Sequence, residues 1–348
     1  MQLTLHHEIE PLLPAWERLF AADPEATPFV SPGWARAWWS HWAESSWRPW
    51  ILTAEDAGEV VGLAPLVLRR RGPLRILRVM GEEPADYWNV LARPDVRTDV
   101  VKAVVGELER RRGQWDALVL KRLPHGSLTE SAVAGCRLAL RSDEPERYPV
   151  LELPDSFDDY LATLSKSRRG NLRRHMRRLD EGEVELRDVS DPAELPDAIE
   201  RWRRFRVAQW EAMDKPLDPE HAGERFRDFT LDVARALVPR GLCRITEFVR
   251  EGRPIASYVN FTDDRSFYWY LGGFEPSAAS LGIGKIAIGE GIRSSIAAGR
   301  LRYDFLRGAE EYKYWYGAAD RNSPSILLHS RRPRSRAAVR LGTATGRL

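Results

Sequence analysis

Residues 267–317 read FYWYLGGFEPSAASLGIGKIAIGEGIRSSIAAGRLRYDFLRGAEEYKYWYG. An aromatic, β-prone run ends in Gly272-Gly273, a loop of small residues follows, and an amphipathic run begins near Gly284. A second apolar run then carries Asp304. This order predicts a strand, a glycine loop, a helix and a strand. Glycines before a helix let backbone N–H groups approach an anion closely, so the stretch favours a ligand that carries phosphate.

Two other interpretations of the glycine loop compete with this one. Gly282 and Gly284 are also residues of the kind that begin an ordinary helix without binding anything. The sequence GIGKIA further matches the G-x-G-x-x-A fingerprint of dinucleotide-binding folds, with Asp304 as the later acidic residue. In that fold the first glycine directly follows the strand, whereas EPSAAS separates the strand end from Gly282. The spacing therefore argues against a dinucleotide site.

Length and composition set the outer limits. A chain of 348 residues is longer than one typical core supports, which predicts two domains. The formal net charge of +2 gives no overall field that would call for nucleic acid. Cys136 and Cys243 are the only cysteines, so neither a disulfide framework nor a metal site is expected. No apolar run is long enough for a membrane span and no signal peptide pattern opens the chain, which predicts a cytoplasmic protein.

The two halves of the chain show a similar order of predicted elements, which favours an internal duplication. In the second half we predict strands at 184–189, 242–249, 254–261, 266–271, 301–306 and 325–329, and helices at 192–213, 219–238, 284–298 and 311–316. In the first half we predict strands at 3–6, 49–53, 60–67, 74–79, 87–91, 115–120 and 148–153, and helices at 11–21, 32–43 and 96–112. Local matches support the repeat: Gly58–Gly62 parallels Gly252–Ala256, and Trp115–Leu118 parallels Tyr303–Leu306. The first copy has no G-x-G before its helix, so a phosphorylated ligand would belong to the second.

The expected boundaries are a first domain at 1–154, a linker helix at 155–182, a second domain at 183–330 and a disordered, arginine-rich tail at 331–348. Ser156 is the predicted N-cap of the linker helix. One face of that helix is basic and carries Lys166, Arg168, Arg169, Arg173, Arg174, Arg177 and Arg178. This face is either a solvated surface or an anion platform, in which Arg173 and Arg174 bind substrate. His175 is expected on the surface, and the tryptophans at 34, 38, 39 and 42 form a predicted core stripe.

Several segments together resemble the GNAT acyltransferase superfamily, and within it the CelD-like branch, in which two such domains are fused as in the Fem-type aminoacyl transferases. The segments are 270–274, 282–284, 299–308, 312–314 and the linker SKSRRGNLRRHMRRL. The resemblance implies an α/β (α+β) fold of two tandem domains, each a mixed, mostly antiparallel sheet flanked by helices. It also implies a coenzyme A thioester donor, with pantetheine between two splayed central strands and pyrophosphate on the glycine loop. One departure is Ala279, which stands where the superfamily's loop usually has Gln or Arg.

Acyl transfer to an amine requires a base, a donor for the oxyanion and a proton for the leaving thiolate. The resemblance implies that N–H groups near Leu271, Gly272 and Gly273 polarise the carbonyl and that Tyr312 or Tyr316 protonates the sulfur. Asp304 is the candidate base or substrate anchor, with an ion pair to Arg302 or Arg307 as its structural alternative. Lys313 is a candidate for neutralising an anion. Further candidates are Gly282, Ile283, Gly284 and Lys285 for the donor, Arg307 and Glu275 for the acceptor, and His221 and Glu275 as reserve bases.

The sequence therefore predicts an N-acyltransferase that moves an acyl group from acetyl-CoA or another acyl-CoA to an amine, such as an amino sugar or a small metabolite. The first alternative is a Fem-type transferase that uses aminoacyl-tRNA, for which the basic linker helix would bind tRNA. The second is a non-catalytic accessory protein of exopolysaccharide assembly. The sequence leaves open the acceptor, the acyl length and the oligomeric state.

Overall fold

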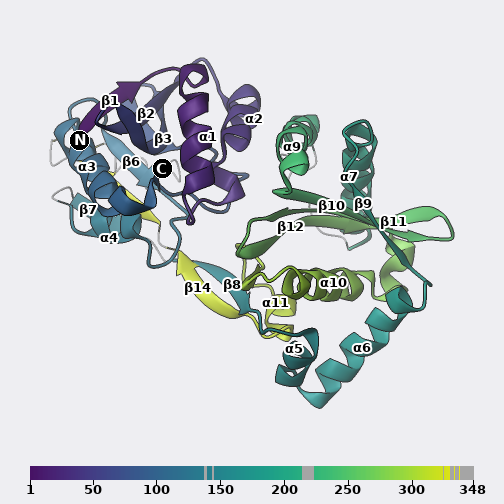
Figure 1. Cartoon of the computed structure of the whole chain (residues 1–348). Coiled ribbons are helices and arrows are strands. Elements are labelled where there is room, and N and C mark those ends of the chain that lie inside the picture. The colour runs from purple at the N-terminus through teal and green to yellow at the C-terminus, as the bar shows by residue number, and fades with distance from the viewer. Residues whose placement is uncertain are drawn as a thin grey trace. The chain divides into compact units, whose positions relative to one another are not determined.

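The computed structural model describes residues 1–136, 139–142, 145–213, 223–323 and 325–329, together with 333 and 337. The chain divides into two compact units, Met1–Glu146 with Asn322–Leu348 and Arg147–Arg321 (Figure 1). Each unit is a mostly antiparallel sheet flanked by helices, which confirms the predicted α/β fold class. His221 and most of the arginine-rich tail lie outside the described residues. Within the described residues, no helix combines the length and apolar character needed to span a bilayer.

The sheet of the first unit has the strand order β1-β2-β3-β4-β6-β15-β7, with β5 beside β3. The strands are β1 (Gln2–His6), β2 (Trp47–Asp56), β3 (Glu59–Arg71), β4 (Leu74–Val79), β5 (Leu91–Ala92), β6 (Ala117–Leu120), β7 (Ala139–Ser142) and β15 (Ile326–His329). The helices are α1 (Leu13–Ala22), α2 (Pro32–Trp42), α3 (Arg97–Arg110) and α4 (Leu128–Ala134). The sequence did not predict α4 or β7. The strand predicted at 87–91 is reduced to β5.

Helix α2 buries a stripe of tryptophans, as its spacing predicts. Trp34, Trp38 and Trp42 recur every four residues and lie in the core, while Trp39 is half-buried. Positions four apart share one face of a helix, so the stripe packs as a unit. The indole N–H of Trp38 donates to the carbonyl of Glu82 at 2.9 Å. The stripe therefore serves the core of the first unit.

The sheet of the second unit has the order β14-β8-β13-β12-β11-β10-β9. The strands are β8 (Glu146–Glu152), β9 (Glu185–Val189), β10 (Cys243–Arg250), β11 (Arg253–Thr262), β12 (Ser266–Phe274), β13 (Arg302–Asp304) and β14 (Ala319–Ser323). The helices are α5 (Phe157–Thr163), α6 (Lys166–Asp180), α7 (Leu195–Ala212), α9 (Glu224–Leu237), α10 (Ile283–Ala297) and α11 (Glu311–Trp315). Helices α7 and α9 cover one face of this sheet, and α10 covers the other (Figure 1).

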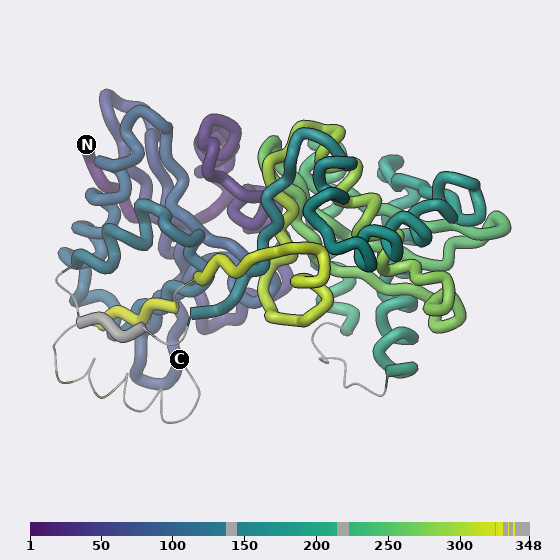
Figure 2. Tube along the Cα trace, turned by 90° about the horizontal axis from the view of Figure 1, so that it is seen from below, coloured from purple at the N-terminus to yellow at the C-terminus, as the bar shows by residue number. Residues whose placement is uncertain are grey.

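Two strands pair in the sheet opposite to the expected one. Strand β8 ends the first half of the chain but pairs with β13, with Tyr303 opposite Leu151. Strand β15 ends the second half but pairs with β6, with Leu327 opposite Val119 (yellow beside blue in Figure 2). The two halves thus exchange their last strands. Neither the apolar pattern nor the turn residues of these strands specify a partner strand, so the exchange is invisible in the sequence.

The hairpin between β2 and β3 repeats between β10 and β11, as the first local match suggests. Ala57-Gly58 and Glu251-Gly252 both have positive φ, which suits the tight turn of a two-residue hairpin. The second match is less regular. Asp116 precedes β6 and binds Arg75, whereas Asp304 ends β13.

The basic segment predicted as one helix forms two. The Ser156 hydroxyl accepts the N–H of Asp159 at 3.1 Å, which confirms this N-cap. Leu164 is extended and ends α5, and Ser165 then caps α6. Helix α6 packs along α10, where a β-carbon on Gly289 would lie 2.6 Å from the sulfur of Met176. The expected linker is therefore part of the second unit and lies beside α10.

Candidate active site

The strands β12 and β13 separate after a short parallel pairing. Their register runs from Ser266–Arg302 to Tyr268–Asp304, and β12 then continues to Phe274. At the point of separation β12 carries a bulge, because Trp269 and Tyr270 together stand opposite Asn260 of β11. The Asn260 side chain accepts the N–H of Tyr270 at 3.2 Å. Beyond Tyr268 this edge of β12 therefore pairs with no strand that the structure describes, and we call this unpaired edge the opening.

One backbone amide of the Gly272-Gly273 pair is directed at this opening. The N–H of Glu275 donates to the carbonyl of Ile255 at 2.8 Å, and the register from Leu271 to Phe274 is regular. Residues alternate along an antiparallel pair, so Leu271 and Gly273 point their N–H groups at β11. Gly272 points its N–H at the other edge. Of the three predicted residues, Gly272 therefore has the geometry of a donor to a ligand in the opening.

Tyrosine side chains gather beside the opening, under α10. Five of their hydroxyl groups are close enough to influence one another's ionisation, those of Tyr160, Tyr258, Tyr303, Tyr312 and Tyr316. Tyr258 stacks on Trp269 with ring centroids 4.8 Å apart. Within the described residues, the buried hydroxyls of Tyr258 and Tyr303 have no hydrogen-bond partner. Buried hydroxyls are normally bonded, so these two are suited to meet a ligand.

Gly291 of α10 makes room for one of these hydroxyls. A β-carbon at Gly291 would lie 2.9 Å from the Tyr303 oxygen. Burial raises the pKa of Tyr303 well above its usual value, and the neighbouring tyrosines raise it further. The hydroxyl therefore stays protonated at neutral pH.

Tyr312 and Tyr316, the predicted proton donors, differ in exposure. Tyr312 is 44% exposed, and partial burial followed by the charge of Glu310 raises its pKa to about 12. Tyr316 is buried and stacks on Phe305 at 5.8 Å, and burial raises its pKa further above the usual range. Its carbonyl accepts the Tyr160 hydroxyl at 3.2 Å. Tyr312 is thus the predicted donor that reaches the surface.

Asp304 holds the turn that follows β13. Its side chain is buried, and one oxygen accepts the N–H of Leu306 at 2.8 Å. Leu306 has a φ of +57°, an unfavourable conformation for a residue with a β-carbon. Arg302, a suggested partner of Asp304, instead lies 3.7 Å from Glu152. The carboxylate therefore stabilises a strained turn next to the tyrosines.

The ammonium group of Lys313 binds the turn that follows β13. Its side chain is 3% exposed, and its ammonium donates to the carbonyls of Leu306, Arg307 and Gly308 at 3.2, 2.7 and 3.1 Å. Glu310 lies 2.9 Å away. An ammonium has three N–H donors, so these carbonyls occupy it.

The glycine loop is enclosed by α6. Gly282 has a φ of +69° and stands directly before α10. His175 is buried, contrary to the expected surface position, with Nδ1 3.1 Å from the carbonyl of Leu281. Arg178 donates to the same carbonyl. Burial lowers the pKa of His175, and the charges of Lys285, Arg174 and Arg178 lower it further. The surroundings of the loop are therefore cationic.

The other loop residues divide into anchors and exposed groups. Ile283, the first residue of α10, is fully buried in the core. A β-carbon on Gly284 would meet open space. Lys285 donates to Asn171 at 2.9 Å and lies 5.4 Å over the Trp315 ring. Gly284 is thus the position where an anion can approach the start of α10 without a steric barrier.

The predicted acceptor residues are scattered. Arg173 is exposed and lies 3.4 Å from Asp158, and Arg174 is exposed on the same helix. Glu275 follows β12 and lies 3.1 Å from Arg253. Arg307 lies in the turn after β13, and its carbonyl accepts a hydrogen bond from the Lys313 ammonium. The donor candidates thus lie on β12 and at the start of α10, and the acceptor candidates lie on α6, after β12 and after β13.

This arrangement of a bulged strand, a splayed parallel neighbour and a glycine loop before a helix has a counterpart in known proteins. Residues 166–314 match the family model of the acetyltransferase (GNAT) domain. The matched GNAT domain extends from the start of α6 to Tyr314 in α11, so it includes the opening, the glycine loop and Tyr312. No curated protein sequence matches the chain.

Solved structures share the fold over nearly the whole chain. FemX is 9% identical, with 95% of this chain and 96% of that chain covered and a TM-score of 0.64. The C-terminal domain of a putative lysylphosphatidylglycerol synthetase from Agrobacterium fabrum is 11% identical, with 97% and 96% covered and a TM-score of 0.58. A conserved protein of unknown function from Bacteroides thetaiotaomicron is 9% identical, with 94% and 100% covered and a TM-score of 0.57. These likenesses show that the tandem fold recurs.

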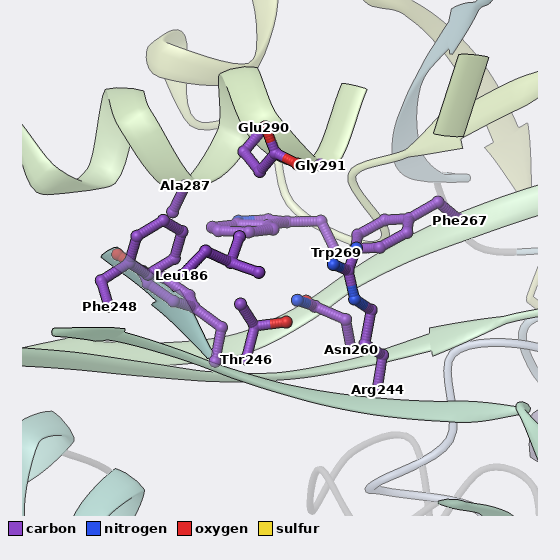
Figure 3. A pocket seen from close by; sticks show the side chains of 11 residues that line it. Leu186, Arg244, Thr246, Phe248, Asn260, Phe267, Trp269, Ala287, Glu290 and Gly291 are labelled. Carbon is purple, nitrogen blue, oxygen red and sulfur yellow. The ribbon is translucent and has the colours of Figure 1, made fainter. Parts of the chain in front are cut away.

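A narrow cavity lies within the GNAT domain between α10 and the sheet (Figure 3). Its volume of about 10 Å³ has room for about one water. Trp269 lies flat between the helix and the strands, with Thr246 and Asn260 below it (Figure 3). A larger cavity of about 330 Å³ is lined by Arg244, Ser294 and Arg300, and none of its lining residues belongs to the glycine loop. Neither of these two cavities is lined by Gly272.

Several residues beside this site were missed in the sequence. Tyr160, Tyr258 and Tyr303 come from three separate elements, and their apolar neighbours suggest only a core. Only the β12 bulge and the strand exchange bring them together, so no spacing in the sequence identifies them. In the described part of the chain, His, Cys, Asp and Glu form no group of three or more that could hold a metal.

Proposed function

We propose that the GNAT domain of this chain transfers an acyl group from an acyl-CoA thioester to an amine. The observation that carries the proposal is the opening between β12 and β13, which has the Gly272 N–H on its edge, tyrosine hydroxyls beside it and the cationic glycine loop at the start of α10. Acyl-CoA is a thioester with a phosphate-bearing tail. Its carbonyl can accept the Gly272 N–H, its leaving sulfur can accept a proton from a tyrosine hydroxyl, and its phosphates can bind the cationic glycine loop.

The donor's phosphates are assigned to the start of α10. The N–H groups of Ile283 and Gly284 lie at the helix N-terminus, where the dipole favours negative charge, while the N–H of Lys285 donates to the carbonyl of Gly282 at 2.8 Å. Ile283 anchors the helix in the core, and Gly284 leaves the approach open. The acyl thioester supplies the electrophilic carbonyl, and the Gly272 N–H stabilises the charge that develops on its oxygen.

Tyr312 is the proposed proton donor. The amine nitrogen attacks the carbonyl carbon, the C–S bond breaks, and the thiolate receives the Tyr312 proton. The nitrogen loses its own proton to solvent, and the Tyr312 phenolate takes up a proton from solvent. With a pKa of about 12, Tyr312 is protonated at neutral pH and available for this step. We assign Asp304 and Lys313 to positioning, because their polar atoms hold the turn between β13 and α11.

A matched pair of substitutions at Gly284 tests the donor site. Gly284→Asp and Gly284→Asn place side chains of equal size in open space and differ only in charge. We expect calorimetry to show acetyl-CoA binding that is weakened about tenfold or more by Asp and much less by Asn. Absence of binding by acetyl-CoA and by longer acyl-CoAs, or equal affinities of the two variants, would refute the proposal.

The basic face of α6 supports a second candidate, a transferase that takes its acyl group from aminoacyl-tRNA. Lys166, Arg174 and Arg177 are exposed, and none has an ion pair within the described residues. The fold likeness to FemX is consistent with this candidate. It predicts tRNA binding whose affinity falls steeply with salt and is lost on charge reversal at Arg174 and Arg177. Acyl-CoA turnover without tRNA would exclude it as the main activity.

A further inference from the structure

Helix α7 carries four arginines, of which Arg204 is exposed and the other three lie in different surroundings. Arg201 lies 2.7 Å from the buried carboxylate of Glu247, and Arg203 lies 2.7 Å from Glu200. Arg206 has no hydrogen bond or ion pair to any residue that the structure describes, and its Nε is buried. Arg201 and Arg203 thus each pair with a carboxylate, whereas Arg206 pairs with none among the described residues.

Arg206 lies directly against β12. A β-carbon on Gly273 would lie 2.6 Å from the Arg206 Cα, so only a glycine allows α7 to come this close. The guanidinium stands 5.6 Å over the Trp210 ring and close to Tyr270. Tyr270 in turn packs edge-on against Phe261 at 5.0 Å. Arg206 is therefore a cation among aromatic rings.

This placement is costly for a cation. A guanidinium removed from water needs a carboxylate or another anion to offset the loss of hydration. Burial lowers the pKa of Arg206, which reports the same unfavourable environment. The rings of Trp210 and Tyr270 offer only weak compensation. A half-buried cation whose Nε is buried and unpaired among the described residues is a candidate site for a ligand of opposite charge.

Arg206 lies on the face of β12 away from the glycine loop. Gly272 faces Tyr258, which packs under α10 with Ile283, whereas the neighbouring Gly273 faces α7. The face of β12 that is covered by α10 and the face that is covered by α7 share one edge, and the N–H of Gly272 points out from that edge. A group bound by Arg206 would therefore approach that edge from the side opposite to the donor.

We propose that Arg206 binds an acidic group, a carboxylate or a phosphate, on the amine acceptor, so that the enzyme acylates anionic amines. The inference rests on the proposed function, and it names the class of acceptor. A planar guanidinium binds either group through two parallel hydrogen bonds. Tyr270 and Trp210 provide rings against which the rest of the acceptor packs.

The experiment uses pairs of small amines that differ in one acidic group. Glycine is compared with glycinamide, and phosphoethanolamine with ethanolamine, on the full chain by calorimetry and by tryptophan fluorescence. We expect the anionic member of at least one pair to bind, and its identity tells a carboxylate site from a phosphate site. Arg206→Gln should weaken that binding about tenfold or more, Arg206→Lys should restore part of it, and Arg204→Gln should leave it unchanged, because Arg204 is exposed on the same helix.

Thermal stability separates a binding role from a structural one. Arg206→Gln removes a half-buried charge that has no ion pair among the described residues, so Tm should stay the same or rise, whereas Arg201→Gln deprives the buried Glu247 of a partner and should lower Tm. A lowered Tm for Arg206→Gln alone, equal binding of anionic and neutral amines, or no response to about 10 mM of either anionic amine would overturn the inference. Acyl-CoA is absent from these measurements. Failure of donor binding would therefore refute the proposed function and leave the anion result standing.

Discussion

His175 and Gly282 are in direct contact, and the imidazole occupies the space that a β-carbon on Gly282 would fill. The contact joins the basic helix α6 to the loop before α10. It explains why a glycine is needed there beyond its φ of +69°. The same contact makes the conformation of the proposed phosphate loop depend on a titratable residue.

Gly282→Ala should destabilise the protein by about 2–4 kcal/mol, since the left-handed conformation and the overlap with His175 both contribute. Urea unfolding measures this loss. Gly284→Ala is the control, because its β-carbon meets open space. Adding His175→Ala to Gly282→Ala should recover part of the loss. Strictly additive effects of the two substitutions would contradict the contact.

The free energy of unfolding should fall on acidification because His175 becomes protonated more readily in the unfolded chain. Burial lowers its pKa in the folded state, so the folded protein binds the proton less readily than the unfolded chain. This contribution is complete above the unfolded pKa of about 6.5 and is lost as pH falls below it. His175→Gln should flatten the dependence between about pH 7 and pH 5. Burial also lowers the pKa of His6, so His6 affects stability in the same direction. Because His6 is present in both the unmodified protein and His175→Gln, its effect cancels in the comparison. Identical pH profiles would show that His175 does not titrate in this way.

Tyr312→Phe should lower kcat of acyl transfer by about 10²-fold with little change in donor affinity, because only protonation of the leaving thiolate is lost. Stopped assays of thiol release measure kcat. Tyr314→Phe is the matched control on the same helix, since its hydroxyl binds Asp320. With a Tyr312 pKa of about 12, no alkaline decline of kcat from this group is expected below about pH 10. Full activity of Tyr312→Phe would remove Tyr312 from the mechanism.

Lys313→Met should destabilise the protein by at least about 2 kcal/mol, because three carbonyls lose their donor. Denaturant unfolding measures this change. Lys313→Arg should not restore stability, since a planar fork cannot reach the three carbonyls as an ammonium does. A stable Lys313→Met protein with abolished turnover would instead place Lys313 at the substrate.

Local patterns in the sequence predicted most individual elements. The apolar periodicity of α2 and α3, the cap at Ser156 and the turn at Glu251-Gly252 rest on interactions within a few residues, and each appears close to its expected place. The glycine loop before α10 was found for the same reason. The resemblance to the GNAT superfamily rested on segments of the second half and the basic linker, and the family match covers residues 166–314. The CelD-like branch stays a prediction.

Long-range pairing decided the rest. The exchange of β8 and β15, the burial of His175 and the convergence of five tyrosines all join residues far apart in the chain. Side-chain periodicity fixes which face of an element is buried but not which element it meets. The sequence by itself therefore determined a strand, a glycine loop and a helix suited to an anion. Only the tertiary structure decided that α6 closes over that loop and that Arg206 lies against β12, because both depend on close approaches permitted by glycines at 282, 289 and 273.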